Sequence, residues 1–256
     1  MDGLRVHEQP LNLAGQRAVV TGASRGIGRA VAELLAVRNA DVILLARSRS
    51  DLEEVEREIA TRGGRATSLA VDINDDNALH GVFGSIGPVD ILVNAAGANR
   101  PKPFLDVSGD DLDALINLNL RAMFRVSQFF VRNVVERGSK GVIVNISSQM
   151  GHVGAPDRSV YCATKHGVEG LTKALAIELA PKRVRVVSVA PTFIETAMTR
   201  TFLADPDTYR SLVSKIPIGR LGTLAEVAEA VAFAASPAAA LVTGSSILVD
   251  GGWVAH

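Results

Sequence analysis

The stretch Arg17-Ala18-Val19-Val20-Thr21-Gly22-Ala23-Ser24-Arg25-Gly26-Ile27-Gly28 decides the fold. It runs from an apolar segment through a turn with three glycines into a helical pattern. Such a turn between a first strand and a first helix lets backbone N–H groups approach a phosphate, and the helix N-terminus adds partial positive charge. The glycine spacing here is G-x-x-x-G-x-G, which differs from the usual dinucleotide pattern G-x-G-x-x-G. The loop alone therefore fits either a phosphate site or a tight strand–helix packing.

Short apolar runs and longer helical patterns alternate along the rest of the chain. After the run at Arg17–Thr21, further runs lie at Val42–Ala46, Ala66–Val71, Ile91–Asn94, Val142–Ile146, Val184–Val189 and Ile247–Val249. Helical patterns lie at 26–38, 49–62, 75–84, 108–137, 159–181 and 223–235. Continuous apolar runs are typical of strands covered on both faces. We therefore predict an α/β fold: a single doubly wound domain over 1–256, with about seven parallel strands, helices on both faces and an N-terminal extension at 1–14.

Composition excludes several classes of protein. Lys+Arg 27 balances Asp+Glu 27, so the chain has no basic surplus for nucleic acid or a membrane surface. Cys162 is the only cysteine, which excludes an intrachain disulfide and a Cys-rich zinc site, and we predict no metal. Residues 1–8 carry charges where a signal peptide needs an apolar stretch, and no segment reaches the ~18 apolar residues of a membrane span. We expect a cytoplasmic protein.

Three side chains along the chain suit acid–base chemistry. Tyr161 and Lys165 are four residues apart on an expected helix and so share a face. A nearby ammonium lowers the pKa of a phenol from its reference value near 10, which suits proton exchange with an alcohol or carbonyl. Ser148 follows a buried strand, where its hydroxyl can donate to a developing oxyanion or only to its own turn. Tyr-x-x-x-Lys also occurs by chance on surface helices, so the pair gains weight only in combination.

In combination, these residues resemble the short-chain dehydrogenase/reductase family over about residues 12–254. The T-G-x-x-x-G-x-G loop spans Thr21 to Gly28, Asn94-Ala95-Ala96-Gly97 follows the fourth strand, and Ser148 precedes Tyr161 by thirteen residues. The resemblance implies four catalytic residues: Asn119, Ser148, Tyr161 and Lys165. Asn119 is preferred over its neighbour Asn117, and we expect it to be hydrogen-bonded because an amide in an apolar helix is otherwise costly. Tyr161 then exchanges the proton, while Lys165 lowers its pKa and binds the nicotinamide ribose.

The same resemblance places a nicotinamide cofactor along the sheet edge. The cofactor-binding residues it implies are Gly22, Ser24, Arg25, Gly26, Ile27, Gly28, Arg47, Asp72, Ile73, Asn94, Ala95, Gly97, Tyr161, Lys165, Ile194 and Thr196. Asp72 is also a candidate N-cap for the helix that follows it. The second strand ends at Ala46 and Arg47, without the carboxylate that binds the ribose of NAD. Because a guanidinium suits a phosphate, Arg47 and Arg25 favour NADP(H) over NAD(H).

The chain departs from the family pattern near the nicotinamide end. Thr192 stands where the family has Gly, and Val187 where it has Asn, so we expect a different backbone there if φ is positive. The loops 150–158 and 193–214 are expected to choose the substrate, the second as a lid of mixed polarity. His152, in the first loop, is expected to be an ordinary solvated residue.

Three functions remain open on the sequence. The first is an NADP(H)-dependent oxidoreductase for a small carbonyl or secondary alcohol, including sugars and polyols. The second is a 3-oxoacyl-thioester reductase served by an acidic carrier protein, for which a basic patch is available at Arg132, Arg137, Lys140, Lys182 and Arg183. The third is a non-catalytic NADP-sensing module, which the complete set of four catalytic residues disfavours. The segment 112–135 is apolar on more than one face, and with the resemblance this predicts a homotetramer or homodimer.

Overall fold

Seven parallel strands form one sheet in the computed structural model, which describes residues 11–195 and 205–255. The strands are β1 (Arg17–Thr21), β2 (Asp41–Ala46), β3 (Arg65–Ala70), β4 (Ile91–Asn94), β5 (Gly141–Ile146), β6 (Val184–Pro191) and β7 (Ser246–Val249). Their order in the sheet is β3-β2-β1-β4-β5-β6-β7, and every neighbouring pair is parallel. This confirms the doubly wound α/β fold.

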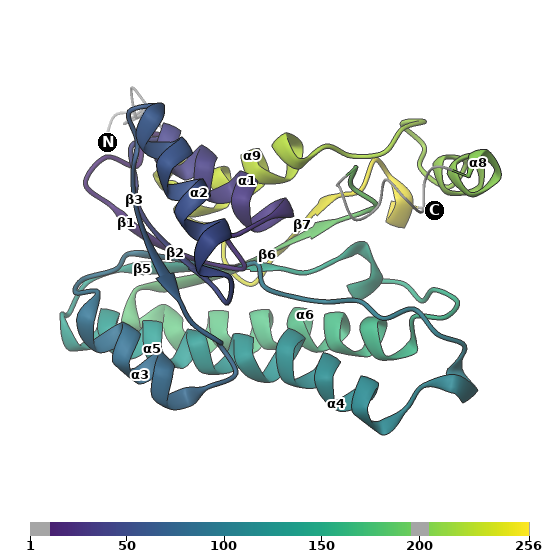
Figure 1. The fold of residues 1–256 in the computed structure, drawn as a ribbon, viewed down its shortest axis with the longest axis horizontal. Helices are drawn as coiled ribbons and strands as arrows, with labels where there is room; N and C mark the ends of the chain where they lie inside the picture. The colour runs from purple at the N-terminus through teal and green to yellow at the C-terminus, as the bar shows by residue number, and fades with distance from the viewer. Residues whose placement is uncertain (1–10, 196–204, 256) are drawn as a thin grey trace, which may run out of the picture.

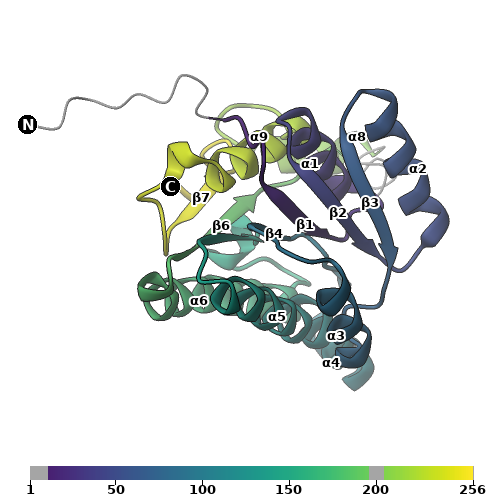
Figure 2. The same ribbon diagram turned by 90° about the vertical axis from the view of Figure 1, so that its left-hand side faces the viewer.

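Helices cover both faces of the sheet (Figures 1 and 2). On one face lie α1 (Gly26–Val37), α2 (Arg49–Thr61) and α9 (Leu224–Ala235). On the other lie α3 (Asp76–Ser85), α4 (Gly109–Ile116), α5 (Met123–Glu136) and α6 (Ser159–Leu179). No helix in the described parts of the chain is both long enough and apolar enough to cross a membrane.

Alternate residues of each inner strand supply two separate cores. In β1, Ala18 and Val20 pack beneath α1 and α9, whereas Val19 packs on the side of α3 and α5. All three side chains are fully buried. Because both faces need apolar residues, the strands read as continuous apolar runs, which is why the sequence predicts their positions within a residue or two.

Two predicted elements differ from the structure. The helix expected over 108–137 is divided: between α4 and α5 lies a wider π-helical segment, η2 (Asn117–Ala122). Part of the expected lid forms helix α8 (Pro206–Val213), whose first turn is capped by the carboxylate of Asp205 accepting from Thr208 N at 2.9 Å. The remaining helical segments are the short 3₁₀ turns η1 (Phe104–Asp106), η3 (Gln149–Gly151), η4 (Ala180–Lys182), η5 (Pro237–Ala239) and η6 (Trp253–Ala255).

The direction in which strands are added reverses at β1. From β1 the chain first builds outward to β2 and β3, then returns to place β4 on the other side of β1. In open α/β sheets, the crevice beyond the carboxyl ends of the strands at such a reversal is where ligands bind. The fold therefore directs attention to the loops that follow Thr21, Asn94 and Ile146.

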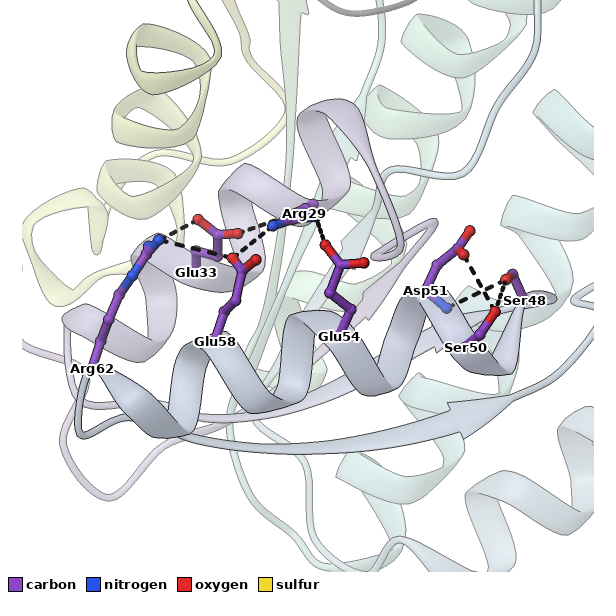
Figure 3. A network of polar contacts seen from close by, with 8 residues as sticks. All are labelled: Arg29, Glu33, Ser48, Ser50, Asp51, Glu54, Glu58 and Arg62. Atoms are coloured by element: carbon purple, nitrogen blue, oxygen red, sulfur yellow. Dashed lines mark hydrogen bonds and ion pairs between the residues drawn. The ribbon is translucent and has the colours of Figure 1, made fainter.

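A charged network joins the outer faces of α1 and α2 (Figure 3). Arg29 contacts Glu33 at 2.8 Å, Glu54 at 3.2 Å and Glu58 at 2.6 Å. Arg62 adds contacts with Glu33 at 3.1 Å and Glu58 at 3.8 Å. The hydrogen bond with Glu33, followed by those with the other carboxylates, raises the pKa of Arg29 above its ordinary value, against the opposing effect of burial. This network joins α1 to α2 through contacts between their own side chains.

Candidate active site

The glycine loop between β1 and α1 needs its glycines for two physical reasons. Gly22 and Gly26 have φ of +66° and +56°, a region that residues with a side chain rarely adopt. A Cβ on Gly28 would lie 2.2 Å from the Gly22 carbonyl oxygen, so the two ends of the loop touch only because residue 28 is glycine. A Cβ on Gly26, in contrast, would meet no atom within 4 Å, so the outer side of the loop is open.

Thr21 fixes the loop after β4 beside the glycine loop. Its hydroxyl is buried and accepts hydrogen bonds from the N–H groups of Ala95 and Ala96, at 3.1 and 3.2 Å. A Cβ on Gly22 would lie only 2.8 Å from Ala96 Cα, so this approach also depends on glycine. Two loops from separate parts of the chain thereby form adjacent walls of one crevice.

Arg25 and Arg47 lie at the glycine loop and directly after β2. Both side chains are exposed, and neither forms a hydrogen bond or ion pair with another described residue. Ser48, the next residue, caps α2 by accepting from Asp51 N at 3.4 Å. The residue after β2 is therefore an exposed arginine, and the last residue of the strand, Ala46, carries no carboxylate.

The residues expected beside the adenine and ribose have specific local roles. Asp72 is exposed and accepts from the backbone and side-chain nitrogens of Asn74, both at 3.0 Å. It is not the cap of α3, because Asp75 caps that helix by accepting from Asn77 N at 2.9 Å. Ile73 is buried.

Asn94 lies at the end of β4 with its side chain inside the protein. Its amide donates to Asn145 at 2.9 Å and to Ser127 at 3.1 Å. Asn145 in turn donates to Thr172 of α6 at 3.0 Å. The side chain of Asn94 therefore ties β4 to β5 and α5, and Ala95 and Gly97 follow it into the crevice.

Tyr161, Ser148 and Lys165 meet at the carboxyl end of β5. Lys165 is buried, donates to the Ile146 carbonyl at 2.8 Å and lies 5.6 Å from the centre of the Tyr161 ring. Ser148 is buried, and its hydroxyl donates to Gln149 at 2.8 Å and accepts from Met150 N at 3.1 Å. These three side chains form a compact site from two elements that are far from the glycine loop in sequence.

Burial dominates the ionisation of the two titratable groups. It raises the pKa of the Tyr161 phenol, while a hydrogen bond with Ser148 and the positive charge of Arg158 act in the opposite direction. Burial also lowers the pKa of Lys165 to about 8, against the influence of Glu169. The expectation that Lys165 brings the Tyr161 pKa below its reference value is therefore not met in this structure, because loss of hydration is the larger effect.

Asn119 lies in the π-helical segment and clamps the loop after β4. Its side-chain oxygen accepts from Ala98 N at 2.8 Å, and its amide nitrogen donates to the Ala98 carbonyl at 2.9 Å and to Thr164 at 3.2 Å. Asn119 is fully buried, whereas Asn117 is exposed, as the choice between them requires. A π-helical turn inside an α-helix often occurs at a functional site, and here it turns Asn119 toward the site.

Comparison with known proteins agrees with this geometry. Residues 22–254 match the family model described as enoyl-(acyl carrier protein) reductase. The chain belongs to the short-chain dehydrogenase/reductase family. It is 39% identical over 245 residues to L-xylulose reductase of Bos taurus, covering 96% of this chain and 99% of that one. It is also 39% identical over 246 residues to a 3-oxoacyl-[acyl-carrier-protein] reductase of Vibrio harveyi, covering 94% of this chain and 98% of that one.

A solved structure extends the similarity to the fold. The protein described as a putative 2-deoxy-D-gluconate 3-dehydrogenase of Agrobacterium tumefaciens, with bound NADP, superposes with a TM-score of 0.92 at 39% identity. The match covers 96% of this chain and 99% of that one. This short-chain dehydrogenase/reductase is therefore an oxidoreductase with relatives that act on sugars, sugar acids and acyl thioesters.

Sequence reasoning missed a buried polar cluster behind Lys165 in this dehydrogenase/reductase. The Glu169 carboxylate, one helical turn along α6, accepts from Ser188 at 2.8 Å and from Ser246 at 3.2 Å. His152 lies 3.4 Å from the same carboxylate and 3.0 Å from Ser246, so it is not a solvated loop residue as expected. The i,i+4 spacing of Lys165 and Glu169 is the sequence signal that could have shown this cluster.

The nicotinamide end of the expected site is described only in part. Ile194 is buried and pairs through a parallel bridge with Gly222. Thr192 is not among the described residues with positive φ, so replacing the family glycine causes no backbone strain there. Thr196 lies outside the described residues, as do the other residues of 196–204 in the expected lid. Within the described chain, no group of three or more His, Cys, Asp or Glu side chains could hold a metal ion.

Proposed function

We propose that this protein is an NADP(H)-dependent oxidoreductase that interconverts a small carbonyl compound and its secondary alcohol. The observation that carries the proposal is the meeting of Ser148, Tyr161 and Lys165 beside the glycine loop, at the sheet edge where α/β folds bind ligands. A protein that only sensed the cofactor would not need a buried cation and a buried phenol against one another.

The residues present fit a phosphorylated dinucleotide. The open outer side of Gly26 and the N-terminus of α1 suit a pyrophosphate. Arg25 and Arg47, which no described carboxylate neutralises, suit the 2′-phosphate of NADP. Asp72, Ile73, Asn94, Ala95 and Gly97 are proposed to line the adenosine and ribose side, and Ser24, Ile27, Gly22 and Gly28 the loop itself. Ile194 and Thr196 are proposed to contact the carboxamide.

Side chains of the protein bind the carbonyl oxygen of the substrate and supply its proton. When bound, NADPH supplies the hydride for the carbonyl carbon. Ser148 donates a hydrogen bond to the carbonyl oxygen, and Tyr161 donates the proton that makes it a hydroxyl. Because burial raises the Tyr161 pKa, the phenol stays protonated at neutral pH, as reduction requires. The Lys165 ammonium stabilises the phenolate left behind, and Asn119 holds the adjacent loop and supports proton exchange.

We propose sugars, polyols or their acids as the substrate class, which follows relatives such as L-xylulose reductase. The alternative, reduction of a carrier-bound 3-oxoacyl thioester, is supported by a relative of equal identity. The basic patch suggested for a carrier does not favour it, because Arg137 and Arg183 stand just before β5 and β6, at the opposite sheet edge from Ser148. Both also contact main-chain carbonyls of their own fold, Val89 and Gly138.

Replacing Tyr161 by Phe tests the proposed chemistry with the largest effect. We expect kcat for reduction to fall by about 10²–10⁴, the usual contribution of a general acid. The dissociation constant for NADPH, measured by fluorescence titration, should change less than threefold. The substrates are L-xylulose, a keto-gluconate, diacetyl and a 3-oxoacyl thioester.

Ser148→Ala should also lose turnover, and Ser147→Ala provides the matched control. Ser147 is equally buried, and its hydroxyl has no hydrogen-bond partner in the structure. Retention of wild-type rates in Tyr161→Phe would refute the assignment. NADPH binding by the wild type without turnover of any substrate would support the cofactor-sensing alternative, and turnover of the thioester alone would support the carrier-linked one.

We further propose assembly as a homotetramer or homodimer through the long helices and the last strand. Large apolar side chains are exposed on α4, α5, α6 and β7, and they are Leu112, Ile116, Phe124, Val135, Ile177 and Leu248. Burying such side chains between copies is favourable by roughly 25 cal/mol per Å² of apolar surface. Light scattering after size exclusion measures the mass, and a monomer of 27.0 kDa would contradict the proposal.

A further inference from the structure

A small pocket opens beside Tyr161, between the loop after β4 and the loop before α6. Three cationic side chains line it: Arg100, Lys102 and Arg158. Because these cations lie close to the proposed acid–base group, they are placed to bind a negatively charged group of the substrate. Which of them is available to a substrate depends on what each already binds.

Arg100 and Lys102 are both committed to one carboxylate. Arg100 contacts Asp111 at 3.0 Å, and Lys102 contacts its other oxygen. Ser108 donates to the same carboxylate at 2.9 Å. The hydrogen bond from Lys102, then those from Ser108 and Arg100, hold the pKa of Asp111 well below its usual range. Two cations and one carboxylate leave one positive charge in this group, and the Asp157 carboxylate, which lines the same pocket, offsets that charge.

Arg158 is held in place but has no carboxylate partner among the described residues. Asp157, in the left-handed region at φ +56°, presents its main-chain carbonyl to two donors: Lys102 N at 3.0 Å and Arg158 Nη1 at 3.2 Å. The Arg158 Nε is buried and has no hydrogen-bond partner. A buried N–H of a charged group without a partner is costly, and a ligand that accepts from it relieves that cost.

We propose that Arg158 binds a carboxylate of the substrate, so that the enzyme prefers keto acids and hydroxy acids over neutral ketoses and polyols. This inference rests on the proposed function and names its substrate class. Arg158 is the residue just before α6 and Tyr161 lies in its first turn; both line the same pocket, and the positive charge of Arg158 acts on the Tyr161 phenol. The planar fork of a guanidinium donates two parallel hydrogen bonds, one to each oxygen of a carboxylate.

A carboxylate fits this site better than a phosphate ester. Arg100 and Lys102 share Asp111, and the Asp157 carboxylate also lines the pocket, so its three cations and two carboxylates leave one net positive charge. A phosphate dianion brings about two negative charges and three strong acceptor oxygens, which call for more donors than Arg158 alone provides. A single carboxylate close to the reacting carbonyl matches this charge and the pocket that Arg158 and Tyr161 share.

Selectivity between charged and neutral substrates tests the proposal. The ratio of kcat/KM for 5-keto-gluconate to that for L-xylulose is measured in the wild type, Arg158→Gln, Arg158→Lys and Arg100→Gln. We expect the wild type to favour the acid and Arg158→Gln to lower this ratio by about 10- to 100-fold, chiefly through KM for the acid, as loss of a charged hydrogen bond implies. Arg158→Lys should recover part of the ratio, and Arg100→Gln should leave it within threefold.

A binding measurement separates this proposal from the reaction itself. Calorimetry with Tyr161→Phe in the presence of NADP⁺ compares gluconate with xylitol, and Arg158→Gln is added in the same background. Tighter binding of gluconate that disappears with Arg158→Gln supports the role of Arg158 even if turnover is lost. A melting temperature within about 3 °C of the wild type shows that each variant is folded.

Three results would overturn it. Equal losses for 5-keto-gluconate and L-xylulose in Arg158→Gln would mean that Arg158 acts only through the charge it places near Tyr161. A wild-type preference for L-xylulose would refute the carboxylate directly. A preference for xylulose 5-phosphate over 5-keto-gluconate, lost in Arg158→Gln, would replace the carboxylate with a phosphate. Absence of any carbonyl reduction would instead refute the proposed function.

Discussion

Arg29 and Arg25 lie one helical turn apart, yet their side chains have opposite surroundings. Arg29 is surrounded by three glutamates on the outer faces of α1 and α2 (Figure 3). Arg25, at the glycine loop, has no ion pair among the described residues, and the same holds for Arg47 after β2. The paired arginine contacts α2, whereas the unpaired ones belong to the loops that follow the carboxyl ends of β1 and β2.

This difference separates arginines that stabilise the fold from arginines available to a ligand. An exposed pair contributes only about 0–1 kcal/mol, because water screens it and two long side chains are ordered. A guanidinium without a carboxylate keeps its full charge for an anion that arrives later. The same distinction within the pocket beside Tyr161 separates Arg100 and Lys102 from Arg158.

We expect the largest effect on cofactor binding from reversing the charge of Arg47, one of the unpaired arginines. For Arg47→Asp we expect the dissociation constant for NADPH to rise about 100-fold, since a charged hydrogen bond is lost and a repulsion replaces it. Binding of NADH should improve, because a carboxylate there can accept from the ribose hydroxyl.

The matched control is Arg57→Asp, which changes the net charge equally from an exposed position on α2. Fluorescence titration with both cofactors measures the effect. Equal losses in the two variants would attribute it to the overall charge, and unchanged NADPH binding in Arg47→Asp would remove the basis for NADP(H) preference.

Lys165 differs from these arginines because it is buried. Its pKa of about 8 means that it carries its charge below that pH and loses it as the pH rises. We therefore expect kcat for carbonyl reduction, at saturating NADPH, to fall by about tenfold per pH unit above pH 8. The Tyr161 pKa is shifted upward, so Tyr161 does not account for this decline. A profile that stays flat to pH 10 would contradict the role of the ammonium.

The lowered pKa of Lys165 affects the free energy of unfolding in the opposite direction from activity. Because the folded protein disfavours the charged form of Lys165, the destabilisation is complete below about pH 8 and fades as the pH approaches the ordinary value of 10.5. Activity and this contribution to the free energy of unfolding should therefore move in opposite directions between those values. Chemical denaturation at pH 7 and 10, compared between wild type and Lys165→Met, measures the stability side.

The smallest effect is expected at Arg29. Arg29→Gln removes three partly exposed ion pairs and should lower the free energy of unfolding by about 1 kcal/mol, or the melting temperature by about 3 °C. The difference should shrink in 1 M salt, which screens exposed charges. NADPH binding should remain within threefold of wild type, and a larger change would abolish the distinction from Arg47.

The strands and the order of the site residues could be predicted from the sequence. Strands buried on both faces leave continuous apolar runs, as at Val42–Ala46, and the family spacing leads from Ser148 to Tyr161 and Lys165. The π-helical segment around Asn119 could not be predicted, because widening a helix by one residue per turn changes no apolar pattern. Helix α8 was missed because its side chains are of mixed polarity and none is buried.

Which charged side chains form ion pairs could not be predicted from the sequence either. Arg25 and Arg29 have similar neighbours in the sequence, and only the packing of α2 against α1 brings Glu54 and Glu58 to one of them. Likewise, nothing next to His152 in the sequence indicates Glu169, which β6, β7 and α6 together enclose. The partner of a charged side chain depends on contacts between helices and strands, and a local stretch of sequence does not show those contacts.

The hydrogen bond from Ala95 to the Thr21 hydroxyl has a consequence for biosynthesis, since the two residues are 74 positions apart. A chain leaving the ribosome exposes its glycine loop well before the wall that completes the crevice exists. Lys165 emerges later still. The nascent protein therefore passes through a stage in which the glycine loop is present while the proposed catalytic residues Tyr161 and Lys165 have not yet been made.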